Sequence, residues 1–278
     1  MGKKKPPPPL PDPLAGLVDA HTHLDGCRAR TPHEVRALVD RAASVGVNRV
    51  VTVACDLEQA RFVIDASRWD ERVYAAVALH PTDAHQLEVD GAPEELERLA
   101  ADPRCVAIGE TGLDWYWLDK RDDVATPEQQ HTAFGWHIDL AKRLGKPLMI
   151  HNREADADIL ADLDRFGAPD RVIFHCFSGD ADMARECVDR GYVLSFSGTV
   201  TFANAAQLQE AARLVPDGQF LVETDAPYLT PHPYRGTPNE SYCIPYTARF
   251  LAELRGTTAE HIAQITTETA ERVFGPRF

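Results

Sequence analysis

The 278-residue sequence predicts one (β/α)8 barrel of the TIM type, with the barrel over residues 15–278 and a short tail before it. Three observations favour this fold. Eight short apolar runs rich in β-branched residues alternate with segments of helical periodicity, and the length suits a barrel of roughly 250 residues. Several runs are continuous rather than alternating, as expected for a parallel sheet covered on both faces. A doubly wound sheet usually stops at about five or six strands, so the barrel is preferred.

The predicted strands are spread over the whole chain and are separated by turn-forming residues. They lie at residues 17–18, 50–53, 73–79, 106–108, 148–150, 172–174, 193–196 and 220–222.

The segments between the strands carry signals for helix starts and ends. Thr31-Pro32-His33-Glu34 offers a capping threonine, a proline at the first helical position and a carboxylate at the third, and Thr126-Pro127-Glu128-Gln129 repeats the pattern with an amide. Gly46 and Gly145 stand where these two helices should end. The stretch 247–274, interrupted once, is typical of closing helices.

Residues 1–14 are expected to form a disordered tail. Pro6 to Pro9 cannot donate backbone hydrogen bonds and favour an extended polyproline II chain. The basic start, Lys3 to Lys5, has no apolar segment behind it, so we expect no secretory signal.

The composition indicates a soluble cytoplasmic protein with a reduced interior. No apolar run approaches the roughly 20 residues that span a bilayer, so we expect no membrane partner. A chain of this length needs no disulfides, and no CxxC pair is present, so the cysteines are expected to be reduced and to pack as small apolar residues. They are Cys27, Cys55, Cys105, Cys176, Cys187 and Cys243.

The net charge is −14, from 29 basic and 43 acidic residues. Such a surface repels a polyanion, which argues against a protein that coats nucleic acid. It still permits an enzyme that acts on the end of a nucleic acid, because bound divalent metals reverse the local field.

Metal-binding residue types recur at the ends of the predicted strands. The carboxyl ends of barrel strands point to one mouth, so we expect these side chains to converge there. They are His21 and His23 after the first strand, His80 after the third, Glu110 after the fourth, His151 after the fifth, His175 after the sixth and Asp225 after the eighth.

His21 and His23 are two residues apart, and alternation along a strand places such residues on the same face. Both imidazoles can then reach one cation. A single HxH pair, or a lone His151 or His175, is more often structural; the repeated placement at strand ends is what favours a metal site. The other six histidines lie in helical or loop segments and are expected to be surface or packing residues.

Six motifs also carry a family resemblance. The sequence resembles the TatD-type metal-dependent hydrolases, commonly called TatD deoxyribonucleases, of the amidohydrolase-like barrel superfamily, from about residue 17 to the C-terminus. The motifs are Val18-Asp19-Ala20-His21-Thr22-His23-Leu24-Asp25, Leu79-His80-Pro81, Ile108-Gly109-Glu110-Thr111-Gly112-Leu113-Asp114, His151-Asn152-Arg153, His175-Cys176-Phe177-Ser178-Gly179 and Glu223-Thr224-Asp225-Ala226-Pro227-Tyr228-Leu229.

The resemblance implies a metallo-dependent hydrolase with two divalent metal ions. His21, His23 and Asp225 would hold the first ion, His151 and His175 the second, and Glu110 would bridge them. Two cations roughly 3.5–4 Å apart do need an anion between them. The superfamily's alternative bridge, a carbamylated lysine, has no lysine at the corresponding strand end. Mixed imidazole and carboxylate ligands suit zinc, manganese, cobalt or iron, and magnesium stays open.

The activity that the resemblance implies is hydrolysis of phosphodiester bonds of DNA, with DNA ends or oligonucleotides as transient substrates, and we expect no stable protein partner. The resemblance implies a 3′-5′ exonuclease in which Glu110 and Asp225 are catalytic and Asp225 orients or deprotonates the attacking water. Arg153 and Arg235 are candidates for phosphate binding through paired N–H donors. His80 either contacts phosphate, donates a proton or is structural.

Several alternatives stay open. The Arg235 loop departs from the family, since Thr237-Pro238 stands where a basic residue is common. Trp115-Tyr116-Trp117 either offers a surface for base stacking or packs partly into the core, and Asp114 and Asp19 are expected to orient ligands. The same metal pair would also serve an amidohydrolase or lactonase acting on a small molecule, and a barrel kept only for binding is a third reading.

Overall fold

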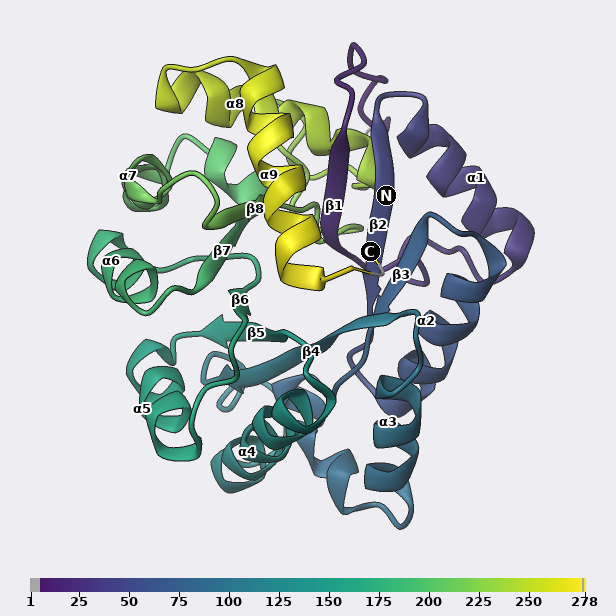
Figure 1. The fold of residues 1–278 in the computed structure, drawn as a ribbon, viewed down its shortest axis with the longest axis vertical. Coiled ribbons are helices and arrows are strands. Elements are labelled where there is room, and N and C mark those ends of the chain that lie inside the picture. Colours follow the sequence, from purple (N-terminus) through teal and green to yellow (C-terminus); the bar gives the residue numbers. More distant parts are fainter. Residues whose placement is uncertain (1–5, 277) are drawn as a thin grey trace.

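Eight parallel strands form the centre of the molecule, and each strand pairs with the next in sequence. The computed structural model describes residues 6–276 and residue 278. A bridge between Thr22 and Ala226 links the first strand to the segment after the last, which brings the two ends of the sheet together. Helices surround the strands in Figure 1. The predicted (β/α)8 barrel is confirmed.

All eight predicted strands are present. They are β1 (Leu17–Thr22), β2 (Val47–Val53), β3 (Val73–Ala76), β4 (Cys105–Asp114), β5 (Leu148–Arg153), β6 (Val172–Phe174), β7 (Val193–Phe196) and β8 (Phe220–Val222). The third strand is shorter than predicted. Its pairing with β4 shifts register between Ala75 and Ala76, and Leu79 already donates its N–H to the side chain of His137 instead of to a strand.

The helices follow the strands in the expected alternation. They are α1 (Pro32–Ala43), α2 (Leu57–Trp69), α3 (Ala92–Ala100), α4 (Pro127–Leu144), α5 (Asp156–Phe166), α6 (Ala181–Asp189), α7 (Ala206–Leu214), α8 (Ile244–Arg255) and α9 (Ala259–Phe274), with short 3₁₀ helices at Pro81–Glu88, Gly198–Thr201 and Ser241–Cys243. Both predicted capping boxes form, at Thr31 and at Thr126. Gly145 ends α4 with a left-handed φ of 61°, which glycine adopts without steric cost.

Two apolar layers hold the barrel. Strand side chains that point into the barrel form one cluster, which includes Val18, Val51 and Ile173. Phe274, from the end of α9, packs against this cluster. A larger cluster fills the space between the strands and the surrounding helices. Because apolar packing occupies one end of the barrel interior, the polar residues at the strand ends are left to line the opposite mouth.

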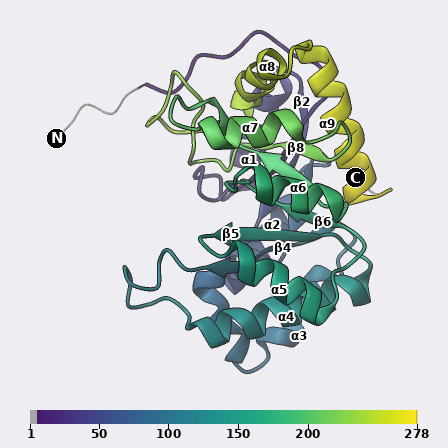
Figure 2. The same cartoon turned by 90° about the vertical axis from the view of Figure 1, so that its left-hand side faces the viewer.

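The N-terminal segment differs from the prediction. Residues 6–14 have no helix or strand, but they pack against the body of the protein as an extended strap along α8 (Figure 2). Tyr242 donates a hydrogen bond to the carbonyl of Pro8 at 2.7 Å, Tyr246 to that of Pro9 at 2.9 Å, and Arg249 to that of Asp12 at 2.8 Å. The expected disorder is therefore wrong for residues 6–14, and residues 1–5 lie outside the described part of the chain.

Among the described residues, no helix combines the length and apolar character needed to cross a membrane.

Candidate metal centre

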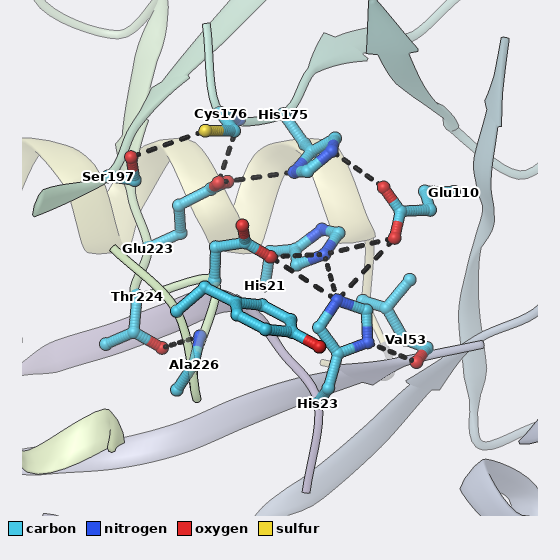
Figure 3. Close-up of polar contacts among 12 residues, drawn as sticks. His21, His23, Val53, Glu110, His175, Cys176, Ser197, Glu223, Thr224 and Ala226 are labelled. Carbon is cyan, nitrogen blue, oxygen red and sulfur yellow. Dashed lines mark hydrogen bonds and ion pairs between the residues drawn. The ribbon is translucent and has the colours of Figure 1, made fainter. Parts of the chain in front are cut away.

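The predicted ligands meet at the carboxyl ends of the strands. His21 lies in β1, Glu110 in β4 and His151 in β5. His175 directly follows β6, and Asp225 is the third residue after β8. Figure 3 shows His21, His23, Glu110 and His175 turned toward one another. The residues that the sequence placed at one mouth are therefore together in space.

The first group of ligand atoms surrounds one oxygen of Glu110. His21 Nε2 and His23 Nε2 are 3.2 Å apart, and they lie 3.8 and 3.6 Å from Glu110 Oε1. Asp225 Oδ1 is 3.6 Å from His21 Nε2 and 3.3 Å from His23 Nε2. The backbone ties this group together as well, because the N–H of Asp225, a residue with a left-handed φ of 52°, donates to the carbonyl of His21 at 2.9 Å.

The second group surrounds the other oxygen of the same carboxylate. His175 Nε2 lies 2.7 Å and His151 Nδ1 lies 3.3 Å from Glu110 Oε2, and the two nitrogens are 3.4 Å from each other. Each Glu110 oxygen thus faces its own set of ligand atoms. This is the arrangement that a bridging carboxylate requires.

The hydrogen bonds on the far side of each ring support metal binding. His23 Nδ1 contacts the carbonyl of Val53 at 3.0 Å, His175 Nδ1 contacts Glu223 at 3.3 Å, and His151 Nε2 contacts Asp114 at 3.0 Å. Because a carbonyl or carboxylate accepts a hydrogen bond from that nitrogen, the nitrogen facing Glu110 can offer a lone pair to a metal. His23 would offer it in the first group, and His151 and His175 in the second.

The spacing of the ligand atoms fits as well. Bonds of 2.0–2.1 Å to a tetrahedral zinc ion place its ligands about 3.3 Å apart. The separations among His21, His23 and Asp225 are 3.2, 3.6 and 3.3 Å. The side chains therefore stand close to where a cation would need them.

Without a cation, burial and charge pull the histidine pKa values in opposite directions. Burial lowers the pKa of His21 well below its usual value, and the neighbouring His175 lowers it further. For His175, burial is outweighed by Glu110, and the pKa is raised well above its usual value. The Glu110 pKa is held well below its ordinary range by His175 and His151, despite its burial. Glu110 is thus a carboxylate anion among imidazoles.

Two residues at the centre were not assigned a role from the sequence. Glu223 accepts a hydrogen bond from the ring Nδ1 of His175 at 3.3 Å and one from the N–H of Cys176 at 2.8 Å. Cys55 donates its Sγ to Glu110 Oε1 at 3.3 Å, and with His23 and Glu110 it forms a further group able to hold a metal. Cys55 thus has a polar contact at the centre in addition to the packing role that we expected of it. Its position just after β2 was the available signal.

The expected orienting acids are both in place. Asp114 is fully buried beside His151. Asp19 accepts the N–H of His21 at 3.3 Å and both the N–H and hydroxyl of Thr224, at 2.9 and 2.6 Å. Burial raises the pKa of Asp19 to about 7. Asp19 thereby joins β1 to the segment that carries Asp225.

Of the three expected substrate-binding residues, His80 contacts a ligand of the centre, whereas the two arginines stack on aromatic rings. His80 Nε2 is 3.3 Å from His151 Nδ1, so His80 borders the second group. Arg153 lies with its guanidinium 3.8 Å from the ring centre of Tyr116. Arg235 is exposed and stacks over Phe202 at 4.5 Å. All three rings of the aromatic run are partly buried, and Trp115 packs against the core.

A family model described as "TatD related DNase" matches residues 18–275. The chain belongs to the TatD family. It is 62% identical over 259 residues to the "Uncharacterized metal-dependent hydrolase TatD" of Mycobacterium tuberculosis, covering 93% of this chain and 98% of that protein. It is 31% identical over 245 residues to the "3'-5' ssDNA/RNA exonuclease TatD" of Citrobacter rodentium, covering 86% and 90%.

Solved structures agree with this membership. The crystal structure of YJJV, a TatD homologue of Escherichia coli K12, matches with a TM-score of 0.81 at 29% identity and covers 93% of this chain and 98% of its own. A β-aspartyl dipeptidase of Fervidobacterium islandicum matches at 15% identity with a TM-score of 0.58, covering 94% and 72%, which shows a shared fold alone. The TatD family of metal-dependent hydrolases thus accounts for the barrel and for its ligand groups.

Proposed function

We propose that this TatD-family hydrolase cleaves phosphodiester bonds at the ends of DNA with two divalent cations, as a 3′-5′ exonuclease. The observation that carries the proposal is the division of Glu110: one oxygen faces His21 and His23, and the other faces His151 and His175. The name of the Citrobacter rodentium relative, a 3′-5′ exonuclease of single-stranded DNA and RNA, supports the substrate class.

His21, His23 and Asp225 would hold one cation, His151 and His175 the other, with Glu110 between them. Bound divalent cations make water a nucleophile near neutral pH and offset the charge that develops on a phosphate. This donor set of imidazoles and carboxylates suits zinc, manganese, cobalt or iron, with magnesium also possible where water completes its shell.

Asp225 is the acid best placed to handle the proton of the attacking water. Its side chain is 16% exposed, whereas that of Glu110 is 4% exposed, so Asp225 is the carboxylate that substrate and water reach. Both imidazole contacts of Asp225 use Oδ1. Its Oδ2 is therefore available to orient the water and accept its proton.

His80 lies at the edge of the centre with a neutral ring. Its Nδ1 contacts the hydroxyl of Thr82 at 2.7 Å and the N–H of Thr82 at 3.2 Å, and its Nε2 faces the centre. Burial, together with the nearby His151, lowers the pKa of His80 to about 3, so the ring is neutral near pH 7. A neutral imidazole is too weak an acid to protonate a leaving group, so the role that we propose for His80 is contact with the substrate phosphate.

Arg153 and Arg235 supply positive charge on opposite sides of the mouth. Arg153 follows His151 by two residues at the end of β5, and its stacking on Tyr116 leaves the guanidinium edge able to bind phosphate. Arg235 lies on the long loop after β8. The unpaired state of the cysteines among the described residues fits the reducing cytoplasm in which we expect the enzyme to act.

The proposal is tested with metal-loaded protein and end-labelled single-stranded DNA. We expect shortening from the 3′ end in single-nucleotide steps, with the Asp225→Asn variant slower by about 100-fold or more under the same conditions. A panel of amides and lactones is assayed in parallel. Turnover of one of these, with no cleavage of DNA by any of the five metals, would replace the nuclease by an amidohydrolase or lactonase.

A further inference from the structure

A cavity of about 1070 Å³ lies beside the candidate metal centre, between the loops that follow β1 and β8. Its volume exceeds the roughly 300–1,000 Å³ of sites for small molecules. The residues that line it and matter here are Arg28, Tyr228, Arg235, Phe202 and Glu240, with Pro7 of the N-terminal strap on one side. No residue of this cavity belongs to the two ligand groups of the centre.

The cavity nevertheless shares a wall with the metal centre. Gly26 lines it, and a Cβ on Gly26 would lie 3.3 Å from Cβ of His23. Tyr228 lines it from the other loop, three residues after Asp225, and donates its backbone N–H to the Asp225 carbonyl at 2.9 Å. The cavity is therefore adjacent to the segments that carry His23 and Asp225.

The charges in the lining favour an anion. Arg28 is exposed, and its side chain has no hydrogen bond or ion pair within residues 6–276 and 278. Arg235 is held against the ring of Phe202. The one acid of the lining, Glu240, forms an ion pair with Arg41. In a chain of net charge −14, the lining is thus locally positive.

Tyr228 adds a surface for an aromatic ring. It is 63% exposed, more than the other large apolar side chains that stand out on the described surface. Every nucleobase has a π face that stacks on such a ring without regard to sequence. An exposed tyrosine in a cavity with two arginines is a combination by which proteins bind single-stranded nucleic acid.

The strap gives the cavity a fixed edge. Pro7 precedes the two carbonyls, of Pro8 and Pro9, that are hydrogen-bonded to Tyr242 and Tyr246. The family match begins at residue 18, so this edge lies outside the matched region. Figure 2 shows the strap reaching the same side of the barrel as the loops that follow the strands.

We propose that this cavity binds the nucleotides adjoining the scissile bond, with Tyr228 stacking on a base and Arg28 contacting a backbone phosphate. The inference rests on the proposed nuclease function and names where its substrate strand runs. It assigns Tyr228 and Arg28 to substrate binding, and neither is a ligand of the centre. Strand length then contributes to affinity until the cavity is filled.

The test measures binding of a fluorescent eight-nucleotide single strand with phosphorothioate linkages to the metal-loaded, full-length enzyme. Tyr228→Ala is expected to raise Kd about 5- to 100-fold, because base stacking contributes on that scale, and Tyr228→Phe is expected to restore binding. Arg28→Gln is expected to reduce the slope of log Kd against log salt by about 0.7, the value for one phosphate contact on a single strand.

Arg98→Gln is the matched control. Arg98 lies in the last turn of α3, at the end of the barrel opposite to the strand ends, so the same loss of charge should leave the slope unchanged. If Tyr228→Ala and Arg28→Gln bind the strand as the wild type does, while the wild type cleaves the ordinary phosphodiester strand, the cavity assignment is overturned and the nuclease stands. If the wild type binds in this pocket-dependent way without cleaving, the cavity assignment stands and the nuclease is overturned.

Discussion

Replacing Glu110 with glutamine tests the central feature of the site with almost no change in shape. The amide keeps the size of the carboxylate but removes its charge. Glu110 Oε1 and Oε2 lie 2.7–3.8 Å from four imidazole nitrogens that belong to two separate groups. If the carboxylate bridges two cations, both lose their shared anion in the variant.

The size of the effect follows from these distances. Two unit charges about 4 Å apart interact by about 4 kcal/mol at an effective dielectric constant of about 20, and a divalent cation doubles this to about 8 kcal/mol. Hydration of the cation in the variant offsets part of it. If half is offset, the remaining 4 kcal/mol or so corresponds to nearly a thousandfold weaker binding. We expect Glu110→Gln to hold one cation or none where the wild type holds two.

Metal content is measured by elemental analysis of protein purified without chelator, and affinity by competition with a chelating dye. Cleavage of end-labelled DNA should fall below detection. Asp162→Asn is the control, because Asp162 is a buried acid paired with a histidine, His131, at 2.5 Å but outside the centre. Circular dichroism establishes that both variants fold. Two bound cations with near-normal cleavage in Glu110→Gln would refute the bridging role.

Three further changes probe the surroundings of the centre. Asp225→Asn is expected to lower kcat by about 100-fold or more while changing oligonucleotide affinity far less; steady-state kinetics and anisotropy decide, and the reverse pattern contradicts its role as base. Glu223→Ala removes the partner of His175 Nδ1 and should weaken metal binding about 10- to 100-fold in the dye titration; unchanged affinity would show that the contact is incidental. Burial lowers the pKa of His137 to about 4 from 6.5. Below pH 6.5 the unfolded chain therefore binds a proton that the folded chain excludes. The free energy of unfolding is expected to decrease by about 3 kcal/mol in total as the pH is lowered from 7 to 4. Urea unfolding from pH 7 to pH 4 should show this loss in the wild type and a shallower one in His137→Asn, and parallel curves would contradict it.

The barrel and the positions of the ligands could be predicted because both follow from local patterns. Continuous β-branched runs such as 50–53 show buried parallel strands directly, and the strand order follows from the alternation with helices. Once the strands were placed, the convergence of His21, Glu110 and His175 needed only the rule that strand ends share one mouth. The four ion-pair distances at Glu110 agree with that reasoning.

The N-terminal strap could not be predicted in the same way. The prolines do exclude helix and strand, and residues 6–14 form neither. Proline carbonyls still accept hydrogen bonds, however, and the donors here are Tyr242 and Tyr246, more than 230 residues away in sequence. Those donors reach the strap from α8 and from the 3₁₀ helix Ser241–Cys243 that precedes it.

The chemical roles of the histidines are set by similarly distant partners. A neutral imidazole offers a lone pair on one nitrogen and a proton on the other, and the sequence of His21-Thr22-His23 does not say which faces the centre. The carbonyl of Val53, from the neighbouring strand, fixes the proton of His23 on Nδ1, whereas Asp114 fixes that of His151 on Nε2. The nitrogen that faces Glu110 is therefore Nε2 in His23 and Nδ1 in His151. Each ring orientation depends on a hydrogen bond on the side of the ring away from the centre.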